Sequence, residues 1–462
     1  MACASRFIRI WVHPGFRALK IRDRQARAQS FGYLYPLVCT SPPPVPRIAE
    51  LPGRVILPNG LRVLHQQVRD TRVVHLALIL DVGSRDEEAH QLGMAHFVEH
   101  MLFKGTRSRK PYHILSRIDN VGGDLDAYTT REKTALTITV SREYVDRALD
   151  LLHDMAFHST FPPAEIDKER TVIAEEIDMY DDSPEERIQE QFDALIFPRH
   201  ELGTPILGTR HSLQAFDRAG LLQYYRTYYR PERAVLSVVG NLGAERLQRL
   251  VERYQHSHEA APPARKPRLL PSPAILPGLQ ELRPIQQAHY LVGGRALSLA
   301  HPHYLPWLLL NNYLGGSAMN SRLNLSVRER HGLSYNAYSY YTPYQDAGIW
   351  GVYAALDAEN LPRLRRIIRR ELDLLMLKPL SPARLAAIKK QFAGTLAISW
   401  ESGSARMMAL AHDWMDGREL LTLPQAIERI RAVEATTLQQ VASLLFDPAQ
   451  LAEAVYLPHE SA

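Results

Sequence analysis

The sequence predicts an α+β fold of two homologous domains, each a mostly antiparallel β-sheet packed with helices. Three observations support this prediction. The chain has 462 residues, which is long for a single hydrophobic core. Short β-rich runs and helical stretches occur in both halves. A stretch with six prolines, between His258 and Gly278, separates the halves. The expected boundaries are a tail at 1–50, a first domain at 51–258, a linker at 259–278 and a second domain at 279–462.

The first domain is expected to open with a hairpin, because Asn59-Gly60 lies between two β-rich runs. Further strands are expected at 71–83, 126–140 and 233–242. Helices are expected at 93–105, 111–121, 142–158 and 164–197, with a break near Pro184, and one more helix to about residue 258.

The second domain repeats this pattern. We expect strands at 288–298, 334–341, 348–356 and 451–458, a helix at 304–316, and two long helices rich in arginine and leucine. The arginines of 361–375 are interpreted as solvated residues of an amphipathic helix. Matching Leu314-Gly315-Gly316 with Phe103-Lys104-Gly105 sets Trp307, Leu310 and Asn311 against His96, Glu99 and His100. In the second copy, mostly apolar residues are enough for packing at these positions. Packing alone therefore does not explain the polar residues of the first copy.

Net charge does not indicate a nucleic-acid partner. The chain carries +5, but residues 1–50 hold eight Arg/Lys against Asp23 and Glu50, a net +6. The remainder is therefore about −1 and is not expected to bind phosphates. Cys3 and Cys39 both lie in the tail, so neither disulfides nor thiolates hold the domains. No run of roughly 18 apolar residues predicts a membrane span.

The tail leaves the compartment open. It is rich in arginine and poor in acidic residues, as an organellar presequence would be, and it lacks the apolar region of a secretory signal. A tail without structure is the alternative. We expect a bacterial cytoplasmic protein, with the mitochondrial matrix and the periplasm as alternatives.

A polar cluster interrupts the apolar stretch GMAHFVEHMLFKG, residues 93–105. On a helix, His96 and His100 project from one face one turn apart, so they can converge on one ion. A catalytic zinc takes three protein ligands and keeps a position for water. Glu99 is placed to accept a proton from that water, in the inverted order His-x-x-Glu-His. The alternative is two core histidines bonded to their neighbours.

The third ligand is expected to be a carboxylate on another element. The stretch KERTVIAEEIDMYDDSPEE offers Glu169, Glu175, Glu176 and Asp178. On a helix Glu169 and Glu176 share a face, whereas Glu175 points about 100° away. Without the upstream motif, this run would be a solvated acidic helix.

These motifs resemble the pitrilysin/insulysin metallopeptidases, specifically the half-length branch that includes mitochondrial processing peptidase and its bacterial homologues. The resemblance covers nearly all of the chain after the tail and rests on LPNGLRV, HFVEHMLFKGT and ERTVIAEEI. It implies that His96, His100 and Glu176 bind one zinc ion per chain and that Glu99 is the general base. It also implies that Glu169 is a second carboxylate near the metal, which orients a ligand or tunes the water.

Two other stretches resemble the family's substrate site. GGDLDAYTTREKTAL resembles an edge strand that binds extended peptides, which implies substrate contacts along Asp126, Ala127, Tyr128 and Thr129. The family usually has asparagine where this chain has Asp126, whose carboxylate accepts hydrogen bonds but cannot donate them.

RERHGLSYNAYSYY places Arg328 and Tyr335 at the spacing of a family pair that holds and polarises the scissile carbonyl. From spacing alone they would be a surface arginine and a strand tyrosine.

The resemblance implies a zinc-dependent endopeptidase of unfolded peptides. Full-length relatives form a clam-like chamber from two such halves, so this chain is expected to form a homodimer, with Arg328 and Tyr335 completing the opposite protomer's site. A non-catalytic scaffold or partner subunit, and a mitochondrial presequence-processing subunit, are the alternatives within the family.

Overall fold

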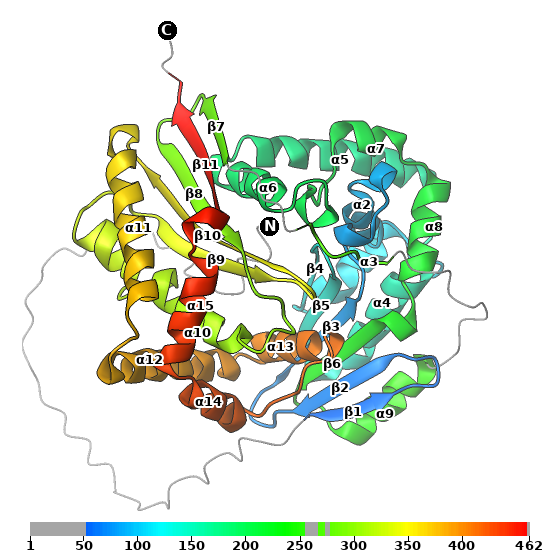
Figure 1. The fold of residues 1–462 in the computed structure, drawn as a ribbon. Helices are drawn as coiled ribbons and strands as arrows, with labels where there is room; N and C mark the ends of the chain where they lie inside the picture. Colours follow the sequence, from blue (N-terminus) through cyan, green and yellow to red (C-terminus); the bar gives the residue numbers. More distant parts are fainter. Residues whose placement is uncertain (1–51, 255–266, 273–277, 460–462) are drawn as a thin grey trace, which may run out of the picture.

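The computed structural model describes residues 52–254, 267–272 and 278–459. It contains two β-sheets, each packed with helices, and the sheets lie side by side in Figure 1. The predicted tail and most of the predicted linker lie outside the described residues. Residues 267–272 are described and form neither helix nor strand.

The first sheet has six strands in the order β1-β2-β6-β3-β5-β4. Neighbouring strands are antiparallel except β2 and β6, which are parallel. The strands are β1 (Gly53–Ile56), β2 (Arg62–Gln67), β3 (Val73–Leu80), β4 (Asp124–Thr129), β5 (Thr134–Ser141) and β6 (Ala234–Gly240).

The second sheet has five strands in the order β7-β11-β8-β10-β9, again with one parallel pair, β7 and β11. The strands are β7 (Gly278–Arg283), β8 (Ala288–Arg295), β9 (Ala337–Pro343), β10 (Gly348–Leu356) and β11 (Leu451–Pro458). Without β1, the two sheets have the same topology. In both, the first strand in the chain lies at one edge and pairs in parallel with the last strand, and the third strand in the chain lies at the opposite edge. The prediction of an α+β fold built from two similar halves is confirmed.

The single strand predicted at 126–140 is wrong. The chain forms a hairpin there, with β4 and β5 joined by the turn Thr130–Lys133. The three charged residues of this turn are all buried. Each pairs outside the hairpin: Arg131 with Asp193, Glu132 with Arg85 and Lys133 with Asp416. Strand β7, within and just after the predicted linker boundary, was not expected either.

The helices of the first half are α2 (Met94–Met101), α3 (Pro111–Asp119), α4 (Val145–His158), α5 (Pro163–Asp181), α6 (Pro184–Ile196), α7 (Arg210–Ala215), α8 (Arg218–Tyr228) and α9 (Ala244–Val251). The break predicted near Pro184 is confirmed, since α5 ends and α6 begins there.

The helices of the second half are α10 (Tyr304–Gly315), α11 (Leu361–Leu377), α12 (Pro382–Glu401), α13 (Gly403–Met415), α14 (Leu423–Ala432) and α15 (Ala435–Leu445), with a π-helical segment at Asn324–Glu329. The two long helices predicted after β10 are present as α11 and α12, but three further helices that were not expected follow them.

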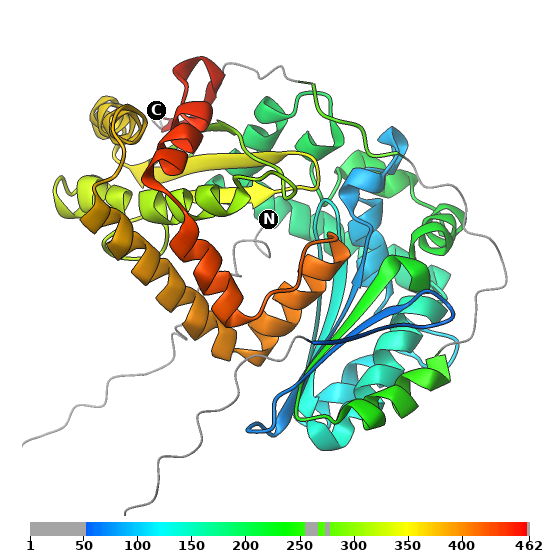
Figure 2. The same cartoon turned by 60° about the horizontal axis from the view of Figure 1, so that its bottom comes forward.

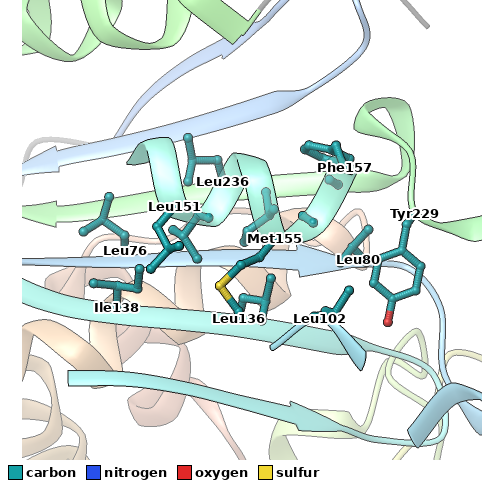
Figure 3. Close-up of a cluster of buried hydrophobic side chains, with 14 of the residues drawn as sticks. Leu76, Leu80, Leu102, Leu136, Ile138, Leu151, Met155, Phe157, Tyr229 and Leu236 are labelled. Atoms are coloured by element: carbon teal, nitrogen blue, oxygen red, sulfur yellow. The ribbon is translucent and has the colours of Figure 1, made fainter. Parts of the chain in front are cut away.

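The main core of the first domain lies between one face of its sheet and the covering helices. Figure 3 shows Leu151 and Met155 of α4 over Leu76 of β3 and Leu136 of β5. Alternate residues of each strand face this core, as strand geometry requires. This packing fixes α2, which carries the predicted metal motif, because Phe97 and Val98 belong to the same core.

One helix of each half packs against the sheet of the other half. Met407 and Leu410 of α13 pack on the second face of the first sheet, against Ile79 and Val235. Ile188 and Phe192 of α6 pack on the second sheet in a cluster that includes Leu291 and Tyr456. Figure 2 shows α13 in orange on one face of the first sheet and the cyan helices on the other. Each sheet is therefore covered on both faces, once by the opposite half.

No helix among the described residues combines the length and the apolar character that crossing a bilayer requires.

Candidate metal centre

Helix α2 is held at its start by a glycine and a buried carboxylate. Gly93 has φ 93°, in the left-handed region that favours glycine, and a Cβ there would lie 2.5 Å from the carbonyl oxygen of Leu207. The carboxylate of Glu87 accepts hydrogen bonds from the backbone N–H groups of Gly93 (3.0 Å) and Ala95 (2.8 Å). These contacts satisfy free donors at the helix N-terminus and set the direction of the helix.

The structure brings His96, His100 and Glu176 together. His96 and His100 lie on α2, and Glu176 lies on α5, which packs beside it. The Nε2 atoms of both histidines lie 3.6 Å from Glu176 Oε2. One ligand atom from each residue lies within 4.8 Å of the other two. The predicted neighbour Glu175 is exposed and does not belong to this group.

This donor set fits zinc. Ligand atoms 2.0–2.2 Å from a tetrahedral zinc are roughly 3.3–3.6 Å apart, which agrees with the 3.6 Å separations above. Burial, reinforced by the neighbouring His100, lowers the pKa of His96 to about 4, so this imidazole is neutral, as a ligand must be. Although burial raises it, the pKa of Glu176 is lowered by His100 and His96, which keeps the carboxylate ionised.

Glu169 bonds the ring nitrogen of His100 that does not face Glu176. Its Oε2 lies 3.0 Å from His100 Nδ1, and its Oε1 lies 2.6 Å from Lys104 Nζ. Burial lowers the pKa of His100, but its bonds to Glu169 and Glu176 raise it to about 9, so a metal at this site would have to displace the proton on Nε2. Because Nδ1 is bonded to Glu169, Nε2 is the ring atom that faces Glu176. Burial opposes ionisation of Glu169, but its bonds to His100 and Lys104 lower its pKa. Sequence reasoning missed Lys104, although it follows His100 by four residues, one helical turn.

Glu99 is buried beside the three ligands and is not one of them. Burial raises the pKa of Glu99 to about 7, near the value that suits a general base at neutral pH. Thr129 Oγ1 donates a hydrogen bond of 2.7 Å to Glu99 Oε2. Sequence reasoning gave Thr129 only a substrate contact and missed this bond, because it joins residues 30 positions apart.

The predicted substrate strand is an edge strand. β4 pairs with β5 on one side and ends the order of the first sheet on the other. Asp126 is exposed, and its Oδ1 accepts a hydrogen bond of 2.9 Å from the backbone N–H of Ala127. The side chain of Tyr128 is buried toward α13, where its hydroxyl lies 3.1 Å from His412 Nε2. Any contact of Tyr128 with a peptide at this edge is therefore through its backbone.

Arg328 and Tyr335 lie together in the second domain. The guanidinium carbon of Arg328 lies 5.8 Å from the centroid of the Tyr335 ring. Tyr335 is 91% exposed, so this pair projects into solvent. Within the part of the chain that the structure describes, Arg328 has an ion pair with Glu329, at 3.7 Å, and no ion pair or hydrogen bond joins either residue to the three candidate ligands.

Comparison with known proteins shows which family this sequence resembles. Residues 62–210 match the family model "Insulinase (Peptidase family M16)", and residues 215–392 match "Peptidase M16 inactive domain". The uncharacterized zinc protease YmxG of Bacillus subtilis is 35% identical over 84% of this chain and 94% of its own length. An uncharacterized zinc protease of Mycobacterium tuberculosis is 31% identical over 91% of this chain and 96% of its own.

Solved structures share the fold. A protease from Helicobacter pylori superposes with a TM-score of 0.80 at 22% identity, covering 88% of this chain and 100% of its own. A Pseudomonas fluorescens structure described as a peptidase M16 inactive domain gives 0.82 at 17% identity, covering 88% and 98%. Because both family models and the two relatives match most of the chain, this protein belongs to the M16 insulinase-like family of peptidases.

Proposed function

We propose that this protein is a zinc-dependent endopeptidase that cleaves unfolded peptides. The observation that carries the proposal is the approach of His96, His100 and Glu176 to within 4.8 Å of one another, beside the buried Glu99. Two imidazoles and one carboxylate are the ligand set of a catalytic zinc that keeps a position for water. When bound, zinc would polarise the scissile carbonyl and lower the pKa of water.

Glu99 acts as general base and then general acid. Its carboxylate accepts a proton from the attacking water and delivers it to the leaving amine of the cleaved bond. Thr129 holds one oxygen of Glu99, which leaves the other oxygen to take the proton. Glu169 and Lys104 keep His100 in the orientation that ligation requires.

The substrate binds as an added strand along β4. Backbone hydrogen bonds at an open sheet edge give affinity with little dependence on side chains. Thr129 is the last residue of β4 and also the residue that bonds Glu99. A peptide paired with β4 would therefore lie next to Glu99. This accounts for the position of the open edge of the first sheet beside the metal site.

The proposed assembly is a homodimer. Arg328 and Tyr335 together offer a cation and a phenol donor, which suit the negative charge that develops on a carbonyl oxygen. Their exposure, and the absence of a bond to the candidate ligands among the described residues, favour action on a second protomer. We propose that they complete that protomer's site.

The test is hydrolysis of a quenched fluorescent, unstructured peptide by wild type and Glu99→Gln, with zinc content measured on both. We expect wild type to bind one zinc per chain and cleave, and a chelator to abolish cleavage. Glu99→Gln should retain zinc while kcat/KM falls by about 10²–10⁴-fold, the usual contribution of a general base.

The neighbouring acids of α5 give a matched pair of variants. Glu176→Gln should lose zinc and activity, whereas Glu175→Gln, which removes an exposed carboxylate one residue away, should retain both. A wild type that binds zinc and cleaves no peptide would overturn the proposal in favour of a scaffold or partner subunit. Equal effects of the two variants would overturn the ligand assignment.

A further inference from the structure

The second domain contains a cavity of about 210 Å³ that is separate from the metal centre. It lies between the π-helical segment 324–329 and helices α11 and α12, and four of its lining residues are arginines. The residues that line it are Tyr313, Asn320, Arg322, Leu325, Ser326, Arg330, Arg370, Glu371, Leu374 and Arg384. Because ordinary binding sites for drug-sized molecules span about 300–1,000 Å³, this cavity suits a compact ligand or one end of a longer one.

One wall of the cavity is fixed by a neutralised arginine. Arg322 Nε donates a hydrogen bond of 2.6 Å to Glu371 Oε2, and the Arg322 guanidinium carbon lies 5.7 Å from the centroid of the Tyr313 ring. Glu371 is buried. This pair leaves no spare carboxylate in the lining for the remaining arginines.

The other three arginines are exposed and have no counter-charge in the lining. Across the residues that the structure describes, Arg330, Arg370 and Arg384 have neither an ion pair nor a side-chain hydrogen bond, and the lining holds no acid besides Glu371. They come from three separate segments, which the fold brings to one cavity. Three like charges gathered without a counter-charge repel one another, and a bound anion would relieve that repulsion.

The arginines of α11 were expected to be solvated residues of an amphipathic face. Arg363 and Arg366 agree with that expectation, since both are exposed and neither lines the cavity. Arg370 is exposed as well, and it differs only in lining the cavity together with Arg330 and Arg384 from two other segments. What distinguishes Arg370 from Arg363 and Arg366 is therefore its arginine neighbours and not its burial.

We propose that this cavity binds a diphosphate group. Arginine guanidinium groups bind phosphoryl oxygens in a bidentate manner, and three of them match the roughly three negative charges of a diphosphate near neutral pH. Asn320 adds an amide donor in the same lining. Leu325 and Leu374, which are 43% and 41% exposed, border the cavity and offer apolar surface to an organic group attached to the diphosphate.

The test is titration calorimetry of the full chain with inorganic pyrophosphate at physiological salt. The test variant is Arg370→Gln/Arg384→Gln, and the control is Arg363→Gln/Arg366→Gln, which removes the same charge from exposed positions of α11. We expect saturable binding by wild type and the control, and at least about tenfold weaker binding by the test variant. Pyrophosphate can also chelate zinc, but the heat of chelation should be the same for wild type and both double variants, so it does not affect the comparison.

Two outcomes would overturn the proposal: wild type that shows no saturable binding beyond chelation, or equal weakening in both double variants, which would indicate general attraction to a basic surface. Arg384→Lys, which keeps the charge and loses the bidentate fork, guards against misfolding of the double variant and should bind more weakly than wild type. ADP distinguishes the sources of the group. Tighter binding of ADP than of pyrophosphate indicates a nucleotide, and equal or weaker binding indicates free diphosphate.

Discussion

Helices α2 and α10 occupy the same place in two similar domains but have opposite character. Each follows the strand that is third in the spatial order of its sheet when β1 is left out, and each precedes the strand at the far edge. The first carries His96, Glu99 and His100. The second has the fully buried Trp307 and Leu310 at the matched positions. Residues 215–392, which include α10, match a model that is itself described as an inactive domain.

The difference shows that this helix position needs no buried charge in order to pack. Burying the carboxyl of Glu99 costs folding free energy, and the rise of its pKa to about 7 reflects the loss of hydration. Leu310 is buried at the matched position without this cost, because its side chain is apolar. Under the proposed function, the polar residues of α2 trade stability for chemistry, as active sites commonly do.

The largest expected effect comes from making α2 resemble α10. In Glu99→Leu, kcat/KM for an unstructured peptide should fall by about 10²–10⁴-fold, because the proton acceptor is lost. The unfolding midpoint of the same protein should stay equal or rise, because a buried carboxyl is replaced by an apolar side chain. Peptide hydrolysis and thermal unfolding measure the two effects. A large drop in the midpoint would show that Glu99 also holds the fold.

The reverse exchange should damage stability. Leu310→Glu places a carboxyl at a position that is 1% exposed, within a cluster of buried hydrophobic side chains. We expect a loss of about 3–5 kcal/mol in the free energy of unfolding, the usual cost of an unpaired buried charge. Urea denaturation measures it, with Leu310→Met as the volume-conserving control, expected to cost less than about 1.5 kcal/mol. Equal losses would mean that shape, and not charge, governs this position.

The third prediction concerns the hydrogen bond that orients His100. Helix α10 has no metal-binding histidine to orient. Glu169→Gln keeps the size of the side chain but weakens the bond to His100 Nδ1 and removes the charge that Lys104 neutralises. We expect zinc affinity to fall by about 10–100-fold, as for other partners of metal-bound histidines. Competition with a chromogenic chelator measures the affinity. Glu175→Gln should match wild type, and a similar loss there would point to general electrostatics on α5.

The grouping of the candidate ligands was predictable in part because these residues follow short-range rules. His96, Glu99 and His100 share one helix, and Glu169 and Glu176 share one face of another, so helical spacing alone groups them. The family resemblance then selected Glu176 over its neighbours. What spacing could not supply was the link between the two helices, which depends on how they pack.

Contacts between distant segments were not predictable. The turn Thr130–Lys133 was taken as part of a strand because its charged residues give no sign, in sequence, that three different segments pair with them. The exchange of α6 and α13 between the halves was also missed, since each helix has a buried face but the sequence does not say which sheet covers it.

The two exchanged helices meet the β4–β5 hairpin in different ways. From α6, Asp193 pairs with Arg131 at 2.7 Å, so the contact joins opposite charges. Directly after α13, Asp416 pairs with Lys133; within α13, His412 bonds the hydroxyl of Tyr128 and has no ion pair among the described residues. The pKa of His412 is lowered to about 3, first by burial and then by the positive charges of Lys133 and Arg418. Only the α13 contact includes a histidine that must stay neutral.

This difference predicts an acid sensitivity confined to α13, which is the smallest of these effects near neutral pH and grows as pH falls. The folded-state pKa of His412, about 3, lies below its ordinary value of 6.5, so the stability it contributes is complete above pH 6.5 and is lost as pH falls toward 3. Each pH unit in this window should cost wild type about 1.4 kcal/mol more than His412→Gln, which retains an acceptor for Tyr128 and cannot be protonated. Urea denaturation at several pH values measures the difference. The exposed His113→Gln should follow wild type, and equal pH profiles for wild type and His412→Gln would show that the charged pairs alone govern the acid response of this interface.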